Sequence, residues 1–264
     1  MKNKANNTTF YLIVSVLAVI AVLAIWQYCT AVLKLVPSTT LPSPQKVVTS
    51  FITKLSNKNP DGATLIQHTM ISLGVALQGY GLALLIGIPL GIMMAWSDPV
   101  DKMVRPLFDL IKPIPGVAWI PLTLVIFGIG MKAKVAVVFI GALVPVILNS
   151  YTGIRQTRDV HIWVARTFGA SRRKMLFKIA IPTALPYIMT GARIALGSAW
   201  MSIVAAELMG STRGLGYMIQ QARGILRVDL VIVGMVSIGL CGGFLTWILS
   251  LVEKLVVKGR GKNV

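Results

Sequence analysis

The stretch VARTFGASRRKMLFKIAIPTALP, residues 164–186, carries five basic side chains and no acidic one, yet it lies between long apolar segments. The chain has 264 residues, of which 55% are hydrophobic and 13% charged, and its mean hydropathy is +0.77. Water-soluble domains are far less apolar than this. The sequence therefore predicts an all-α, polytopic membrane protein in which residues 164–186 connect two membrane spans.

Six apolar stretches, free of formal charge except for Arg193, approach the length needed to cross a bilayer, which takes about 20 apolar residues in a helix. The first one exceeds the apolar core of a signal peptide, and no small-residue cleavage site follows it, so we expect it to remain as a span. We treat residues 1–264 as a single transmembrane domain. The predicted spans are residues 10–29, 71–96, 113–131, 135–151, 184–206 and 230–252.

The basic residues between the spans predict the orientation of the chain. With a cytoplasmic amino terminus, sixteen basic residues fall inside and nine outside, so we expect both termini to be cytoplasmic. The inside residues are Lys2, Lys4, Lys102, Arg105, Lys112, Arg155, Arg158, Arg166, Arg172, Arg173, Lys174, Lys178, Lys254, Lys258, Arg260 and Lys262. The outside residues are Lys34, Lys46, Lys54, Lys58, Lys132, Lys134, Arg213, Arg223 and Arg227. Cytoplasmic loops thus account for the net charge of +18, and we expect no nucleic-acid partner.

The outer segment after the first span predicts a short helix on the membrane surface. Ser43 can cap a helix whose first residue is Pro44. Apolar residues then recur at helical spacing, at Val47, Val48, Phe51, Ile52 and Leu55.

Residues 153–182, here named the elbow loop, form the longest cytoplasmic connection. Asp159 is expected to cap a first helix that ends at Gly169, where a left-handed residue is favourable. Ser171 is expected to cap a second helix over residues 172–180, and Pro182 to break the chain before the fifth span.

An apolar stripe on the first of these helices, made of Ile162, Ala165 and Phe168, is expected to face outward. Anchoring of the topology and binding of anionic lipid would by themselves explain the arginines. They would not explain the Gly169–Ser171 elbow or a connection of this length. A helix that docks in a groove of a soluble partner explains both better.

The elbow loop resembles the signature of ABC importer permeases, which reads Glu-Ala-Ala, three residues, Gly, nine residues, Ile-x-Leu-Pro. This chain has Trp163-Val164-Ala165, then Gly169, then residues 179–182, at the same spacing. The segments LPSPQKV (41–47), GIPLGI (87–92) and TGARIALGSAW (190–200) are similar to permeases of the nitrate, sulfonate, taurine and bicarbonate group. The resemblance covers most of the chain and implies the type I importer fold.

The resemblance also implies a docking role for the elbow loop, through residues 159–182, on an ATP-binding subunit. The residues that match the signature or flank it are Trp163, Val164, Ala165, Arg166, Gly169, Ala170, Ser171 and Arg172. Trp163 departs from the signature, because the family has Glu there and that acid is expected to pair with basic groups of the ATPase. A Trp can still anchor a protein interface.

The chain has no G-x-x-x-x-G-K-[ST] phosphate loop, and its GSTRGLG segment (210–216) lacks the Lys-Ser/Thr ending. We therefore expect no enzymatic activity and no cofactor or metal on this chain, with ATP and Mg²⁺ on a separate ATPase. The resemblance implies two ATPase copies, a second copy of this chain, an extracytoplasmic solute-binding protein and a location in the inner (cytoplasmic) membrane. The implied substrate is a small anion of the sulfonate, taurine, nitrate or bicarbonate type.

Polar residues in two spans are candidates for the substrate path, because ionisable groups in membranes are costly and face protein or water. Arg193 is either an anion-attracting group or a structural one, and Glu207 is expected near the outer end, where it could brace the loop 210–216. Small residues Gly191, Ala195 and Ser198 permit close helix packing, within the chain or with another copy. The path candidates are Gln78, Tyr80, Arg193, Ser198, Met201, Ser202 and Glu207.

Two other classes of protein are less consistent with the sequence. An ion-gradient-driven secondary carrier would need buried carboxylates for coupling, and only Glu207 qualifies. A membrane enzyme would need convergent catalytic groups, whereas His68 and His161 fall on opposite sides of the membrane in this topology.

Overall fold

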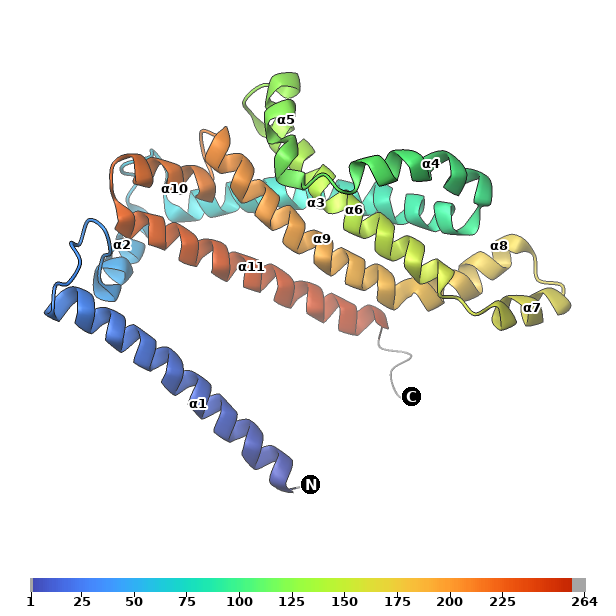
Figure 1. Ribbon diagram of the computed structural model, residues 1–264, viewed down its shortest axis with the longest axis horizontal. Coiled ribbons are helices and arrows are strands. Elements are labelled where there is room, and N and C mark those ends of the chain that lie inside the picture. Colours follow the sequence, from blue (N-terminus) through green and yellow to red (C-terminus); the bar gives the residue numbers. More distant parts are fainter. Residues whose placement is uncertain (1, 258–264) are drawn as a thin grey trace. The chain divides into compact units, whose positions relative to one another are not determined.

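The computed structural model describes the backbone of residues 2–257 and the side chains of residues 10, 11 and 13–256. Every regular element within this part of the chain is a helix (Figure 1). The side chains of Lys2 and Lys4, and residues Lys258, Arg260 and Lys262, lie outside the described part. The chain divides into two compact units, Met1–Ile66 with Met218–Ser237 and Gln67–Tyr217 with Ile238–Val264, which are described separately.

Five helices of the described chain are long and apolar enough to cross a membrane. They cover Ile13–Val32, Leu65–Trp96, Met131–Arg155, Arg172–Met209 and Val228–Val256. Five of the six predicted spans fall on these helices.

The third predicted span, residues 113–131, does not form a single helix. Helix α4 (Asp98–Ile111) is followed by a 3₁₀ turn (Gly116–Trp119) and the short helix α5 (Ile120–Phe127), and the two parts are bent by 86°. Pro113 and Pro115 separate them, because proline lacks the N–H that would continue a helix. The predicted span begins at Pro113, after the charged residues Asp109 and Lys112, so it covers the 3₁₀ turn and α5 but not α4.

The first unit contains α1 (Lys2–Gln27), a π turn (Tyr28–Val32) and α2 (Pro44–Ser56). As expected, Ser43 caps α2 by accepting a hydrogen bond from the Lys46 N–H, and Pro44 is its first residue. Lys54 was counted as an outer loop charge, but its side chain is 1% exposed. Its ammonium group donates to Asp61 at 2.5 Å and to the carbonyls of Asn59 and Ala63. It therefore closes the turn after α2.

A second polar cluster of this unit joins α2 to the start of α11 (Val228–Val257). Ser50 donates to a carboxylate oxygen of Asp229 at 2.7 Å, and Arg227 donates to both oxygens of that carboxylate. This ion pair raises the pKa of Arg227, whose side chain lies just before the helix. Because Asp229 is buried, this ion pair fixes the first turn of α11.

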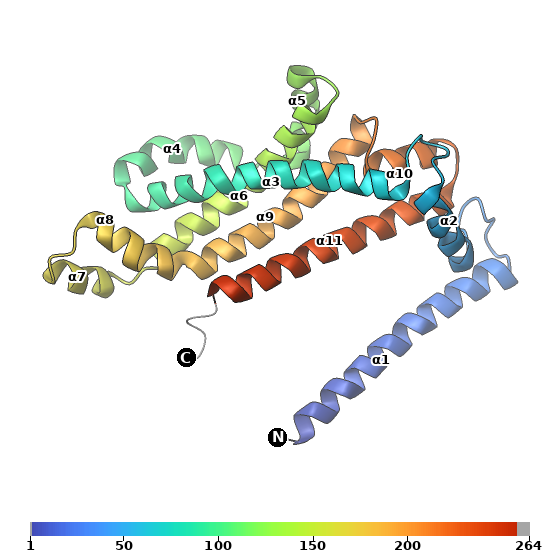
Figure 2. The same ribbon diagram turned by 180° about the vertical axis from the view of Figure 1, so that it is seen from behind.

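The core of the second unit forms where α6 (Met131–Arg155) packs against α3 (Leu65–Trp96) and α9 (Ile181–Met209); Figures 1 and 2 show α6 and α9 lying along each other. A Cβ on Gly91 of α3 would lie 2.6 Å from the Ile147 carbonyl oxygen, and one on Gly191 of α9 would lie 2.6 Å from Asn149 Cβ. Small residues at these sites permit close packing of helices. Gly191 and the buried Ala195 thus pack within the chain.

Only Ser97 separates α3 from α4, and α4 folds back beside the end of α3. Met94 of α3 and Lys112 after α4 line the same small cavity, together with Tyr151 of α6. Arg105 of α4 donates to Asp101 and to the Tyr151 hydroxyl, and its guanidinium lies 5.1 Å from the centre of the Tyr151 ring. These polar contacts fix the rotation of α4.

Candidate functional site

The elbow loop consists of two short helices joined at Gly169. Helix α7 (Asp159–Thr167) ends before Gly169, which has a φ of +74°, and α8 (Arg172–Met175) follows. Ser171 caps α8 by accepting a hydrogen bond from the Lys174 N–H at 3.4 Å. The left-handed glycine and the Ser cap are those expected from the sequence. Asp159 is not the cap of α7: it is the first helical residue, and Arg158 occupies the cap position.

Pro182 does not break the chain before the next span. A π turn over Leu176–Ala180 joins α8 to α9, so one helical run extends over Arg172–Met209. Wider π turns are found where the regular hydrogen-bond ladder is disturbed, and a proline removes one donor from that ladder. The elbow loop is therefore continuous with the fifth span.

The base of the elbow loop is fixed to the helix bundle. Arg172 donates to the backbone carbonyl of Trp96 at 2.8 Å, which satisfies a carbonyl at the end of α3 that has no partner within its helix. The buried Ala180 and Ala184 pack with Ala95 and Ile154. Helix α8 is therefore attached to the end of α3 and to the start of α9.

Helix α7 exposes an apolar side that shares only Phe168 with the predicted stripe. Ile162 and Ala165 are only partly exposed. The exposed side, here named the outward face, consists of Val160, Trp163, Val164, Thr167 and Phe168. These positions follow the i, i+3, i+4, i+7, i+8 spacing of one helix side.

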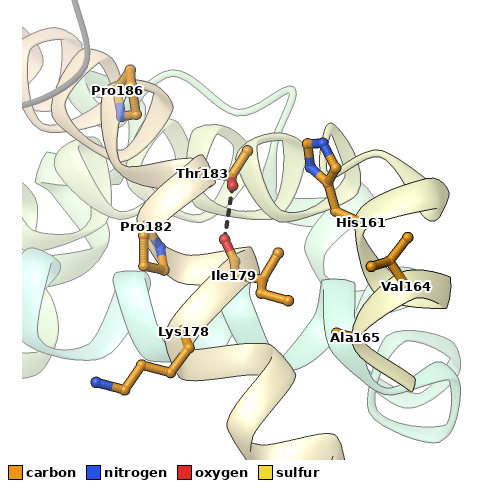
Figure 3. A pocket seen from close by; sticks show the side chains of 8 residues that line it. All are labelled: His161, Val164, Ala165, Lys178, Ile179, Pro182, Thr183 and Pro186. Carbon is orange, nitrogen blue, oxygen red and sulfur yellow. Dashed lines mark hydrogen bonds between the residues drawn. The ribbon is translucent and has the colours of Figure 1, made fainter. Parts of the chain in front are cut away.

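Two cavities flank α7 and separate it from the bundle. Figure 3 shows one of about 590 Å³, in which His161 and Ala165 of α7, together with Val164 at the edge of the outward face, lie opposite residues of the π turn and of α9. The other, of about 710 Å³, is lined by Asp159 and Arg166 together with residues at the ends of α3 and α6. Helix α7 thus has open space on both sides, whereas α8 and the π turn, at the base of the elbow loop, are packed against the bundle.

The candidate path residues fall on different sides of their helices. Arg193 and Met201 lie on an exposed side of α9, where Ser198 is half-buried, and Gln78 is exposed on α3. Tyr80 and Ser202 instead face the core of the bundle. The Tyr80 hydroxyl donates to the Ala192 carbonyl at 3.1 Å. A Cβ added at Gly141 of α6 would lie 2.5 Å from the Ser202 hydroxyl oxygen, so α6 and α9 pack closely at this point.

Arg193 has an acidic partner that the sequence alone did not indicate. Its guanidinium forms an ion pair with Glu253 near the end of α11, and the two side chains are 47% and 28% exposed. Sixty residues separate the partners. The pair joins α9 to α11 and offsets the charge that made Arg193 an anion-path candidate.

Glu207 lies near the other end of α9, and its side chain is buried, with 1% exposed. It accepts hydrogen bonds from Ser72 Oγ at 2.8 and 2.9 Å and from the Gly216 N–H at 2.9 Å. Ser72 Oγ also accepts the Leu215 N–H at 2.9 Å. The buried Lys134 donates to Ser211 of the same loop at 3.0 Å. Side chains from α3, α6 and α9 therefore hold loop 210–216, and the sequence did not reveal Ser72 or Lys134.

Comparisons with known proteins agree with the resemblance carried by the elbow loop. The family model described as binding-protein-dependent transport system inner membrane component matches residues 87–260. The taurine transport system permease protein TauC of Escherichia coli K12 is 35% identical over 240 residues, which cover 91% of this chain and 87% of TauC. The bicarbonate transport system permease protein CmpB of Synechocystis PCC 6803 is 32% identical over 248 residues, covering 93% of this chain and 89% of CmpB.

A solved structure has a related fold. It is described as inward facing conformations of the MetNI methionine ABC transporter. The match has a TM-score of 0.56 at 21% identity and covers 70% of this chain and 95% of the matched chain. At this identity the likeness concerns the fold alone.

Proposed function

Because this chain belongs to the family of binding-protein-dependent transport system inner membrane components, we propose that it imports a small anion with energy supplied through its elbow loop. It is a membrane-embedded permease subunit of an ABC importer, and the ATPase is a separate chain. The proposal concerns the substrate, the copy number and the residues that meet the ATPase.

The substrate class is a small oxyanion or sulfonate. The observation that carries this choice is the similarity over nine-tenths of the chain to permeases named for taurine and bicarbonate. The exposed side of α9, with Ser198 and Met201, is the proposed wall of the path, and Gln78 belongs to it on α3. Arg193 lies on the same side of α9, where the carboxylate of Glu253 partly neutralises its charge.

The elbow loop passes movement of the ATPase to the membrane spans. Its α7 projects between two cavities, whereas α8 is bonded to the end of α3 and continues into α9. A push on α7 at the cytoplasmic side therefore reaches two spans at once. Closure of the ATPase on nucleotide would shift the permease between inward- and outward-facing states, with the free energy supplied on the partner chain.

The complete transporter contains two copies of this chain, two ATPase subunits and an extracytoplasmic solute-binding protein. Each chain has one elbow loop, so one chain serves one ATPase. We propose a cytoplasmic location for both termini, which the distribution of basic residues supports.

Uptake into proteoliposomes tests this function. The permease, its ATPase and the solute-binding protein are reconstituted, and uptake of radiolabelled taurine, bicarbonate, nitrate and methionine is followed with ATP inside. We expect ATP-dependent uptake of one anion and none of methionine. Uptake that persists without ATP and collapses with a proton or sodium ionophore would instead support a secondary carrier.

A further inference from the structure

The outward face of α7 has the spacing and exposure of a docking helix. Val160, Trp163, Val164 and Phe168 are 58%, 63%, 50% and 86% exposed. Apolar side chains at i, i+3, i+4 and i+8 are the anchors by which helices bind in grooves. Trp163 is the largest of them and lies in the middle of the row, where interface hot spots concentrate.

The outward face offers no charged group to a partner. Its one polar member, Thr167, directs its hydroxyl to the carbonyl of Trp163 at 3.1 Å. That hydroxyl is satisfied within the helix, so the residue can present its methyl group outward. A groove that covers this face must therefore be apolar, because a polar group buried against it would have no partner.

The charged residues of the elbow loop are almost all basic. Residues 153–182 contain a single acid, Asp159, which lines the cavity on the bundle side of α7. Arg172 is used at the base of the loop, in its bond to Trp96. The exposed basic residues Arg158, Arg166, Arg173 and Lys174 remain around α7. A partner with an acidic rim would complement them.

We infer that Trp163 is an apolar anchor that enters a hydrophobic, acid-rimmed groove of the ATPase, in place of the charge pair expected of the Glu in the family signature. The inference rests on the proposed function, in which α7 meets the ATPase. It makes Trp163 a determinant of partner choice. An ATPase built to pair with a Glu would bury an unpaired basic group against the indole, which disfavours the wrong complex.

The experiment measures the affinity of the purified ATPase for the full-length permease in nanodiscs, at 0.05 and 0.5 M NaCl. The ATPase is the phosphate-loop protein that co-purifies with the permease, cloned and purified on its own. The variants are Trp163→Ala, Trp163→Glu and Arg173→Ala. Phe177→Ala is the matched control, because Phe177 is 64% exposed on the same loop but lies outside α7.

We expect Trp163→Ala and Trp163→Glu to weaken binding at least about 30-fold, and Phe177→Ala to leave it within about 2-fold. The loss at Trp163 should be the same at both salt concentrations, whereas the loss at Arg173 should shrink at 0.5 M, because salt screens charge but not apolar contacts. An unchanged affinity of Trp163→Ala, or tighter binding by Trp163→Glu, would overturn the inference.

Two further measurements separate this failure from others. Gly169→Val disrupts the elbow backbone, because the residue has a φ of +74°. If that variant binds the ATPase normally, the elbow loop is not the docking site and the proposed function fails as well. The second measurement follows Trp163 fluorescence, taken as the difference between the wild type and Trp163→Phe, in nanodiscs without ATPase. If brominated lipid quenches this fluorescence, the outward face lies in the bilayer and the anchor role is refuted.

Discussion

Ser72 gives the sharpest test of how loop 210–216 is held. Its hydroxyl donates to Glu207 and accepts the Leu215 N–H, and its side chain is fully buried. Ser72→Ala removes both bonds without adding volume. A buried carboxylate then loses a donor, and a backbone N–H loses its acceptor.

The magnitude follows from the kind of bond that is lost. A neutral interhelical hydrogen bond in a membrane protein contributes about 0.6 kcal/mol. A bond to a charged group contributes about 1.5–3 kcal/mol, and an unpaired buried N–H costs about 1–3 kcal/mol. Since neighbouring groups relax, we expect Ser72→Ala to lower the free energy of unfolding by about 2–4 kcal/mol.

The assay is unfolding of the purified permease in mixed micelles with increasing SDS, followed by tryptophan fluorescence. Ser237→Ala is the matched control: Ser237 is 4% exposed, and its hydroxyl donates only to the Val233 carbonyl of its own helix. That substitution should change stability by less than about 0.5 kcal/mol. In a Glu207→Ala background, Ser72→Ala should cost less than it does alone, because the two residues interact directly. If Ser72→Ala matches the Ser237 control, the proposed network does not hold the loop.

Three further sets of substitutions test other contacts by the same unfolding assay, and the last set also uses uptake kinetics. Gly91→Ala places a Cβ 2.6 Å from the Ile147 carbonyl oxygen and should lower the free energy of unfolding by about 1–3 kcal/mol. The control is Gly81→Ala, whose Cβ would have nothing within 4 Å and should be neutral or stabilising. Equal effects of the two substitutions would contradict the close packing at Gly91. Lys54→Met leaves Asp61 without its buried cation and should cost about 3–5 kcal/mol, against less than about 0.5 for the exposed Lys58→Met, and a loss below 1 kcal/mol would refute the role of Lys54. Arg193→Gln and Glu253→Gln should each lower the free energy of unfolding by about 1 kcal/mol, and the double variant should lose less than their sum. If the double variant is stable but has a raised KM for the anion, Arg193 belongs to the path. An unchanged KM gives Arg193 a structural role alone.

The parts of the fold that could be predicted from sequence are those set by local chemistry. The left-handed conformation at Gly169 and the Ser43 and Ser171 caps depend on residues within a few positions of each other. The long spans follow from hydropathy alone. Local chemistry was insufficient in two places. At Pro182 a π turn accommodates the missing donor, and hydropathy does not indicate that α4 and α5 meet at a bend of 86°, because α4 carries several charged residues.

The partners of buried polar groups could not be predicted, because they come from distant parts of the chain. Ser72 and Glu207 are 135 residues apart, and Arg193 and Glu253 are 60 apart. The side of α7 that faces outward also depends on how its base packs. The spacing of apolar residues allowed Ile162 and Ala165 to face outward, yet these two line the cavities next to the bundle, while Val160 and Trp163 are exposed.

Accessibility of position 171 tests the central claim most directly. Ser171→Cys, in a chain with Cys29 and Cys241 replaced by Ser, is treated with a membrane-impermeant thiol reagent in intact cells and in inside-out vesicles stripped of ATPase. The account predicts no labelling in cells, labelling in the stripped vesicles, and protection when the purified ATPase is added back. Labelling in intact cells, or labelling that the added ATPase leaves unchanged, would contradict the transfer of movement through the elbow loop.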